Sequence, residues 1–154
     1  MNQGFSAIVG SGSVAPATFV QFMTATVVTS DTIAGYAVQT AVQSTTSPPC
    51  GIAQMGTRYA PTNELIASSA GQSAAYSGNP IAGYSGDPIK VYKIGDICQL
   101  ALGSSVNPGT LLMPDASGNG TGVPASGSFC YGALAQEGGV SGDWIRVQVT
   151  MGVY

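Results

Sequence analysis

The chain has 154 residues, of which only 7% are charged, and its net charge at neutral pH is −3. Binding to nucleic acid relies on a dense set of phosphate-neutralising lysines and arginines. This chain has four basic residues, spread along its length: Arg58, Lys90, Lys93 and Arg146. The composition therefore predicts neither a nucleic-acid partner nor binding to an anionic membrane surface.

The sequence shows neither a secretion signal nor a membrane-spanning segment. Its N-terminal residues include no lysine or arginine, and glycine and serine interrupt their apolar residues. No apolar run reaches the roughly 18 residues that a membrane span requires. We therefore expect a soluble protein made in the cytoplasm. The low charge suits a protein that works inside a crowded assembly, with a secreted domain of polar, uncharged surface as the alternative.

The first half of the chain predicts short strands and one long insertion. Residues 1–18 have glycine and proline breaks, and they form either an arm that docks on a neighbouring subunit or an edge strand followed by a loop. Residues 19–28 are rich in β-branched and aromatic side chains on both faces, which predicts a strand covered on both sides. Residues 58–83 lack periodicity and are expected to form an insertion. Further strands are expected over residues 36–43, 50–55 and 89–91.

The second half alternates short apolar runs with turn residues. Asn107-Pro108-Gly109 is typical of such a turn, because proline presets φ and glycine tolerates positive φ. In the last run, Ile145, Val147 and Val149 should face the core, while Trp144, Arg146 and Gln148 face outward. The predicted strands cover residues 97–102, 110–113, 129–136 and 143–149.

Two parts of the chain also resemble each other in the same order. Residues 85–91 parallel 141–147, residues 51–54 parallel 133–136, and residues 31–35 parallel 106–109. Chance similarity in a sequence rich in glycine, alanine and serine is the alternative. The repeat predicts one all-β domain over residues 19–154, a small β-barrel or β-sandwich with an N-terminal arm. Its two similar four-strand units would span residues 19–95 and 97–152, with residues 58–83 inserted in the first.

Little in the sequence indicates catalysis. The chain has no histidine, the commonest general base and metal ligand, and its acidic residues lie mostly in or beside predicted turns. Cys50, Cys98 and Cys130 are widely spaced, which predicts buried free thiols and leaves a Cys98–Cys130 disulfide open. We therefore expect no enzyme, no cofactor and no metal site.

Four segments, in a fixed order, resemble a known family. They are Val106-Asn107-Pro108-Gly109-Thr110-Leu111-Leu112, Asp115-Ala116-Ser117-Gly118, Tyr131-Gly132-Ala133-Leu134-Ala135 and Ser141-Gly142-Asp143-Trp144-Ile145-Arg146-Val147. Through them the chain resembles the capsid cement, or head decoration, proteins of tailed bacteriophages. The resemblance covers roughly the last third of the chain. It implies a small β-barrel or β-sandwich on the outside of an expanded phage head, often as a trimer, that bridges neighbouring major capsid proteins.

This resemblance implies a function for the chain. We expect a non-enzymatic structural protein of the virion, made in the host cytoplasm and located on the outer capsid surface. Its partners would be the major capsid protein and further copies of itself, as a homotrimer. The residues expected to contact the capsid or another subunit are Phe5, Ile8, Val9, Trp144 and Arg146.

An alternative function is a carbohydrate-binding or adhesin module of a virion or cell surface. In that case Trp144 and tyrosines such as Tyr76 and Tyr84 would stack on sugar rings.

Overall fold

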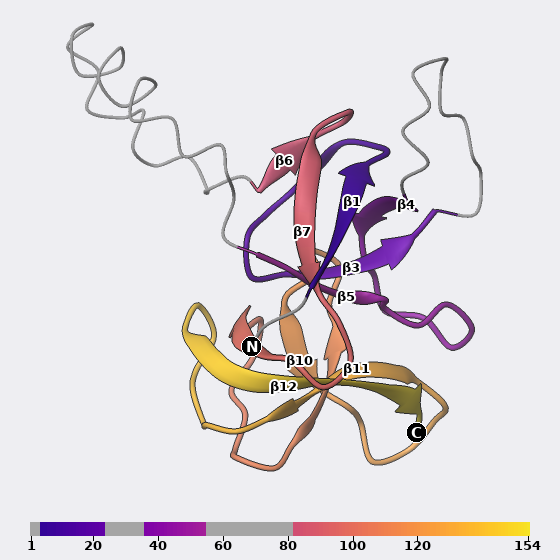
Figure 1. The fold of residues 1–154 in the computed structure, drawn as a ribbon. Helices are drawn as coiled ribbons and strands as arrows, with labels where there is room; N and C mark the ends of the chain where they lie inside the picture. The colour runs from indigo at the N-terminus through magenta and orange to yellow at the C-terminus, as the bar shows by residue number, and fades with distance from the viewer. Residues whose placement is uncertain (1–3, 24–35, 55–81) are drawn as a thin grey trace, which may run out of the picture.

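The computed structural model describes residues 4–23, 36–54 and 82–154, and these residues form β-strands and no helix (Figure 1). The all-β prediction, with a barrel as one of its two forms, is confirmed. The strands of the first half of the chain form the upper part of Figure 1, and those of the second half form the lower part. The described part of the chain contains no helix that could cross a membrane.

Strands of the first half close into a barrel with the order β1-β4-β3-β5-β7. β1 runs parallel to β4 and antiparallel to β7, so both of its edges are paired. A short sheet of β2 and β6 lies at one end of the barrel. The bounds are β1 Phe5–Val9, β2 Ser13–Val14, β3 Phe19–Phe22, β4 Tyr36–Thr40, β5 Gly51–Ala53, β6 Gly83–Tyr84 and β7 Pro88–Tyr92.

The position of β1 corrects the expectation for the N-terminal segment. Residues 1–18 were expected as an arm or as an edge strand with a loop. Instead, β1 is an interior strand of the barrel, because it pairs with β4 on one side and β7 on the other. Ala7 and Val9 point into the barrel core and are buried. The described part of the segment, residues 4–18, therefore packs within its own chain.

The strands predicted over residues 19–28, 36–43, 50–55 and 89–91 all exist, as β3, β4, β5 and β7. Residues 24–28, residue 55 and all but the end of the 58–83 insertion lie outside the described residues. In β3, Phe19 and Val20 are both fully buried, in two different hydrophobic clusters. The start of β3 is therefore covered on both sides, as predicted, whereas Phe22 at its end is exposed.

The second half forms an antiparallel sheet with the order β10-β9-β11-β12-β8. All four predicted strands are present, and in β12 the predicted alternation of buried and exposed residues is confirmed. β10 was not predicted, because its Gly-Thr-Gly sequence has no apolar periodicity. The bounds are β8 Ile97–Ala101, β9 Leu111–Pro114, β10 Gly120–Gly122, β11 Cys130–Ala135 and β12 Trp144–Val153.

The two halves repeat one arrangement of strands. Read across the barrel from β1, the strand order is β1-β7-β5-β3-β4; read across the second sheet from β8, it is β8-β12-β11-β9-β10. Each neighbouring pair in these two orders is antiparallel. The parallel pairing of β1 with β4 closes the first barrel. Its counterpart in the second half is a single parallel bridge between Leu102 and Gly120. The second unit is therefore an incompletely closed version of the first.

Hydrogen bonds repeat between the two units as well. The Ala53 N–H donates to the carbonyl of Thr18 at 2.9 Å, and the Ala135 N–H donates to that of Thr110 at 2.9 Å. Residues 106–109 thus correspond to residues 14–17, and their expected counterpart, 31–35, lies outside the described residues. This common pattern supports the predicted duplication, which stays a prediction, and it adds β1 to the first unit.

The equivalent turns 15–18 and 107–110 each contain a residue with positive φ. Gly109 has φ 81°, and Ala17, at the same position of the first unit, has φ 55°. An L-residue with a side chain pays a steric penalty of about 1–2 kcal/mol in this region. No atom lies within 4 Å of a Cβ added at Gly109, so a substitution there changes the backbone energy alone.

We therefore expect Gly109→Ala to lower the free energy of unfolding by about 1 kcal/mol. Urea denaturation monitored by circular dichroism measures this change. Gly122→Ala is the matched control, because its added Cβ would make an ordinary contact of 3.4 Å with Thr110 Cγ2 and its φ is not in the left-handed region. An equal effect of the two substitutions would contradict the left-handed backbone conformation of Gly109.

Phe19 offers a second test of the fold. Its side chain is fully buried in the hydrophobic cluster of the second unit, whereas Phe22, on the same strand, is 47% exposed. Phe19→Ala should reduce the free energy of unfolding by about 3–5 kcal/mol, because it leaves a cavity in this core. Phe22→Ala should cost no more than about 1.5 kcal/mol. Comparable losses in urea denaturation would show that Phe19 does not carry the packing between the units.

Candidate functional site

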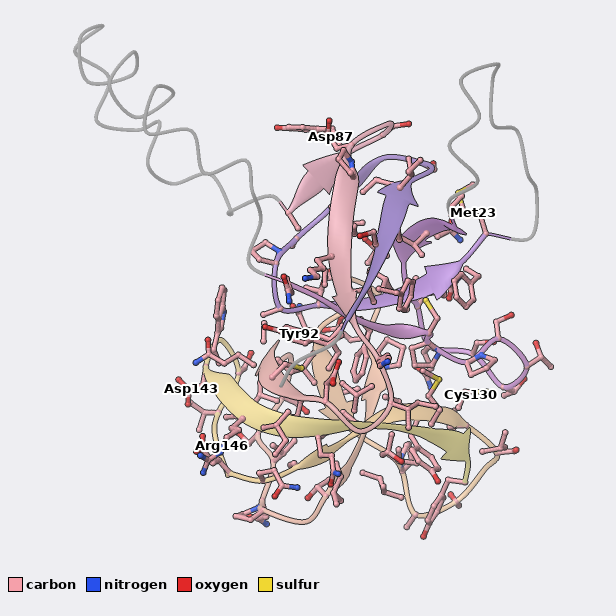
Figure 2. All side chains as sticks on the ribbon, in the orientation of Figure 1. Met23, Asp87, Tyr92, Cys130, Asp143 and Arg146 are labelled. Carbon is pink, nitrogen blue, oxygen red and sulfur yellow. The ribbon has the colours of Figure 1, made fainter. Side chains whose placement is uncertain are left out.

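The expected contact residues lie on two different units. Phe5 and Ile8 are partly buried on β1, and Trp144 and Arg146 are on the outward face of β12. Val9 is fully buried in the barrel core, so its side chain is not available to a partner. Figure 2 shows Arg146 near the outer edge of the second unit, away from the barrel. The structure therefore separates the expected residues into two surfaces.

The first surface is an aromatic patch on the barrel, formed by Phe5 and Phe22. Their ring centroids are 6.0 Å apart, and the ring planes are inclined by 34°. Phe22 keeps 47% of its surface exposed, although Phe19 and Val20 at the start of β3 are fully buried. Phe22 was not predicted as a contact residue, because alternation places it on the same face as Val20, which is buried. The structure shows that β3 ends at Phe22, where the side chain is exposed.

The second surface is the outward face of β12. The guanidinium Nη2 of Arg146 lies 3.1 Å from Glu137 Oε1, and the Arg146 N–H donates to Glu137 Oε2 at 3.2 Å. Both side chains are about half exposed, so solvent screens the pair and it adds little stability. The pair does compensate the charge of Arg146, which makes Arg146 a poor anchor for an anion.

A groove of about 540 Å³ lies beside Trp144, and we call it the Trp144 groove. It is formed where the turn 15–18 of the first unit meets two turns of the second unit, around residues 115–119 and 141–142. Polar side chains that line it include Thr18, Asp115, Ser117, Asn119 and Ser141. Trp144 was predicted to face outward, but its polar neighbours come from distant parts of the chain and were not predicted.

A second groove, of about 490 Å³, lies along β8, on the side of the Arg146–Glu137 pair. Tyr92, Gln99 and Cys98 contribute to its walls. Among the described residues, no three His, Cys, Asp or Glu side chains are placed to hold a metal ion.

The three cysteines are buried free thiols, as the simpler interpretation predicted. Burial raises the pKa of Cys50 to about 12. Burial, with a smaller contribution from the nearby Asp96 carboxylate, also raises the pKa of Cys98 to about 12. Only the thiolate is a good nucleophile, so neither side chain is activated for catalysis at neutral pH.

These pKa values predict slow chemical labelling. At pH 8, roughly one in ten thousand of these thiols would be ionised, compared with about one in ten at the unshifted pKa of 9.0. Iodoacetamide should therefore leave Cys50 and Cys98 unmodified in the native protein and alkylate both in urea. Peptide mass spectrometry measures the modification at each site. Rapid alkylation of Cys98 in the native state would show that the groove along β8 opens to the thiol.

The fold was compared with known proteins. It is a two-unit β fold with one closed and one incompletely closed barrel. No protein-family model matches the chain, and no curated protein matches it in sequence. Among solved structures, the chain is similar to the head fiber gp8.5 N base in bacteriophage phi29, with a TM-score of 0.51. The match covers 95% of this chain and 92% of that chain at 14% sequence identity, so it shows a shared fold.

Proposed function

We propose that the protein is a non-enzymatic structural protein of a phage virion that binds the outside of the head. The observation that carries the proposal is the fold shared with a head fiber base over nearly the full length of both chains. The sequence supports it independently, because four segments between residues 106 and 147 resemble head decoration proteins. The virion in this proposal is that of a tailed bacteriophage.

The proposed mechanism is mechanical. Each copy would bury apolar and hydrogen-bonded surface across neighbouring major capsid proteins, and the many copies on one head together would raise the barrier to rupture. A homotrimer would engage several capsid subunits at once. The low charge of the chain is compatible with such close packing, because it limits repulsion between adjacent copies.

The aromatic patch is the best candidate for the contact with the capsid or with another subunit. Interfaces concentrate their binding energy in a few large side chains near the centre of the contact. Phe22 exposes nearly half of its surface, and Phe5 supports its ring from β1. A partner that covers both rings would remove apolar surface from water that the isolated chain leaves exposed, and this would favour binding. Val42, also exposed on the first unit at 45%, lies outside this ring pair.

Binding to heads that lack the protein tests the proposal. The heads are incubated with purified protein and pelleted, and the bound copies per head are counted. The wild type should saturate at an icosahedral stoichiometry and make the heads more resistant to heat. Phe22→Ala should raise the dissociation constant at least about tenfold, which corresponds to roughly 1.4 kcal/mol, and Val42→Ala should leave it unchanged.

The outcomes separate the parts of the proposal. Failure of the wild type to bind would refute attachment to the head. Saturable binding without a gain in heat resistance would refute cementing and leave attachment alone. Equal binding of Phe22→Ala and Val42→Ala would remove the aromatic patch from the interface. Mass photometry of the free protein measures whether it forms a trimer.

A further inference from the structure

We infer that the Trp144 groove binds a neutral oligosaccharide. The groove lies between the turn 15–18 and the second unit, away from the aromatic patch, so binding there does not depend on attachment to the head through that patch. It starts from Trp144, whose indole is large and apolar and yet remains 36% exposed. The volume of the groove, about 540 Å³, lies within the range of small-molecule sites.

The fold does not require a tryptophan at this position. Asp143 accepts a hydrogen bond from the Val140 N–H at 2.9 Å and fixes the turn that precedes Trp144. In the first unit, Asp87 accepts the same bond from the Tyr84 N–H at 2.9 Å. The strand residue that follows Asp87 is Pro88, which is exposed and much smaller. Because the same turn and strand form without an aromatic ring, stability alone does not explain Trp144.

The polar side of the groove is held in place by its own hydrogen bonds. Asp115 Oδ1 accepts the N–H groups of Ser117 and Asn119, at 2.8 and 2.9 Å, and this fixes the loop that faces Trp144. A Cβ on Gly103 would lie 2.2 Å from Asp115 Oδ2, so the glycine lets the backbone approach this carboxylate. The loop is therefore preorganised without a ligand, which lowers the entropic cost of binding.

Several hydrogen-bonding groups stay available around the indole. Among the described residues, the hydroxyls of Ser117 and Ser141 have no hydrogen-bond partner in the protein, and both residues are exposed. Asp115 Oδ2 has a single weak bond, from Asn119 Nδ2 at 3.4 Å. These hydroxyl and carboxylate groups can pair with the hydroxyl groups on the edge of a sugar, while its apolar C–H face lies on the indole of Trp144.

The charge of the groove selects among ligands. Among the described residues that line it, one is acidic, Asp115, and none is a lysine or arginine. Such a site repels phosphates, sulfates and uronic acids, and it lacks the basic groups that bind nucleic acid. A fully apolar ligand would leave the serine, asparagine and aspartate side chains of the groove without hydrogen-bond partners. A neutral ligand rich in hydroxyl groups satisfies both conditions, and this chemistry is that of an uncharged oligosaccharide.

The chain carries its own probe for this site, because Trp144 is the single tryptophan among its 154 residues. We would titrate it with maltotriose, cellotriose and chitotriose, and with trigalacturonic acid as an acidic ligand of similar size. At least one neutral trisaccharide should give a saturable change in intensity and a shift of the emission to shorter wavelength. Trigalacturonic acid should bind at least about tenfold more weakly, because Asp115 repels it.

Variants identify the groups that bind. The double substitution Ser117→Ala and Ser141→Ala keeps the fluorophore and should weaken binding about tenfold or more, through the loss of two hydrogen bonds. Trp144→Ala should abolish binding in calorimetry. Tyr84→Ala is the matched control: this tyrosine is 50% exposed at the equivalent turn of the first unit, and its removal should have no effect.

The inference is overturned if none of the three neutral trisaccharides changes the emission at millimolar concentration. It is also overturned if trigalacturonic acid binds as tightly as the neutral ligands, or if Tyr84→Ala reduces binding as much as Trp144→Ala. Circular dichroism of each variant shows that a loss of binding is not a loss of fold. Trp144→Ala should still bind heads, which keeps this result independent of the proposed capsid attachment.

Discussion

The contact between Phe19 and Gly132 joins the two units of the chain. A Cβ on Gly132 would lie 2.7 Å from Phe19 Cε1 and 2.4 Å from Pro49 Cγ, so the approach is possible only for glycine. Phe19 packs into the core of the second unit, while the next residue, Val20, packs into the barrel. Two neighbouring residues of β3 thus belong to two different cores. Because Phe19 is fully buried there, the second core is incomplete without the first unit.

The incomplete closure of the second unit explains the rest of the joint. β10 has three residues where β4 has five, and it meets the end of β8 at a single bridge. The turn of the first unit occupies part of the space that is left, since the Ala101 N–H donates to the carbonyl of Ala17 at 2.8 Å. The Trp144 groove lies beside this turn. The groove therefore lies at the place where two otherwise similar units differ.

Local signals in the sequence predicted most strands but not their partners. Alternation identified the buried and exposed faces of β12, and turn residues such as Gly109 and Gly142, both with positive φ, marked the ends of strands. β1 was not recognised as part of the barrel because its pairing with β4 and β7 is non-local, and Val9 was therefore expected on the surface. Of the Trp144 groove, only the outward direction of Trp144 was predictable. Its other walls come from turns that only the fold brings together.

The two candidate surfaces differ in chemistry and in position. The aromatic patch is apolar and lies on the barrel, whereas the Trp144 groove is polar and lies at the junction with the second unit. In Figure 2, Met23, which follows Phe22 in the chain, and Asp143, which precedes Trp144, lie on opposite sides of the molecule. In the proposed arrangement, attachment through the patch leaves the groove accessible. One chain can then hold the head with its closed barrel and bind a saccharide beside its open one, without competition between the two contacts.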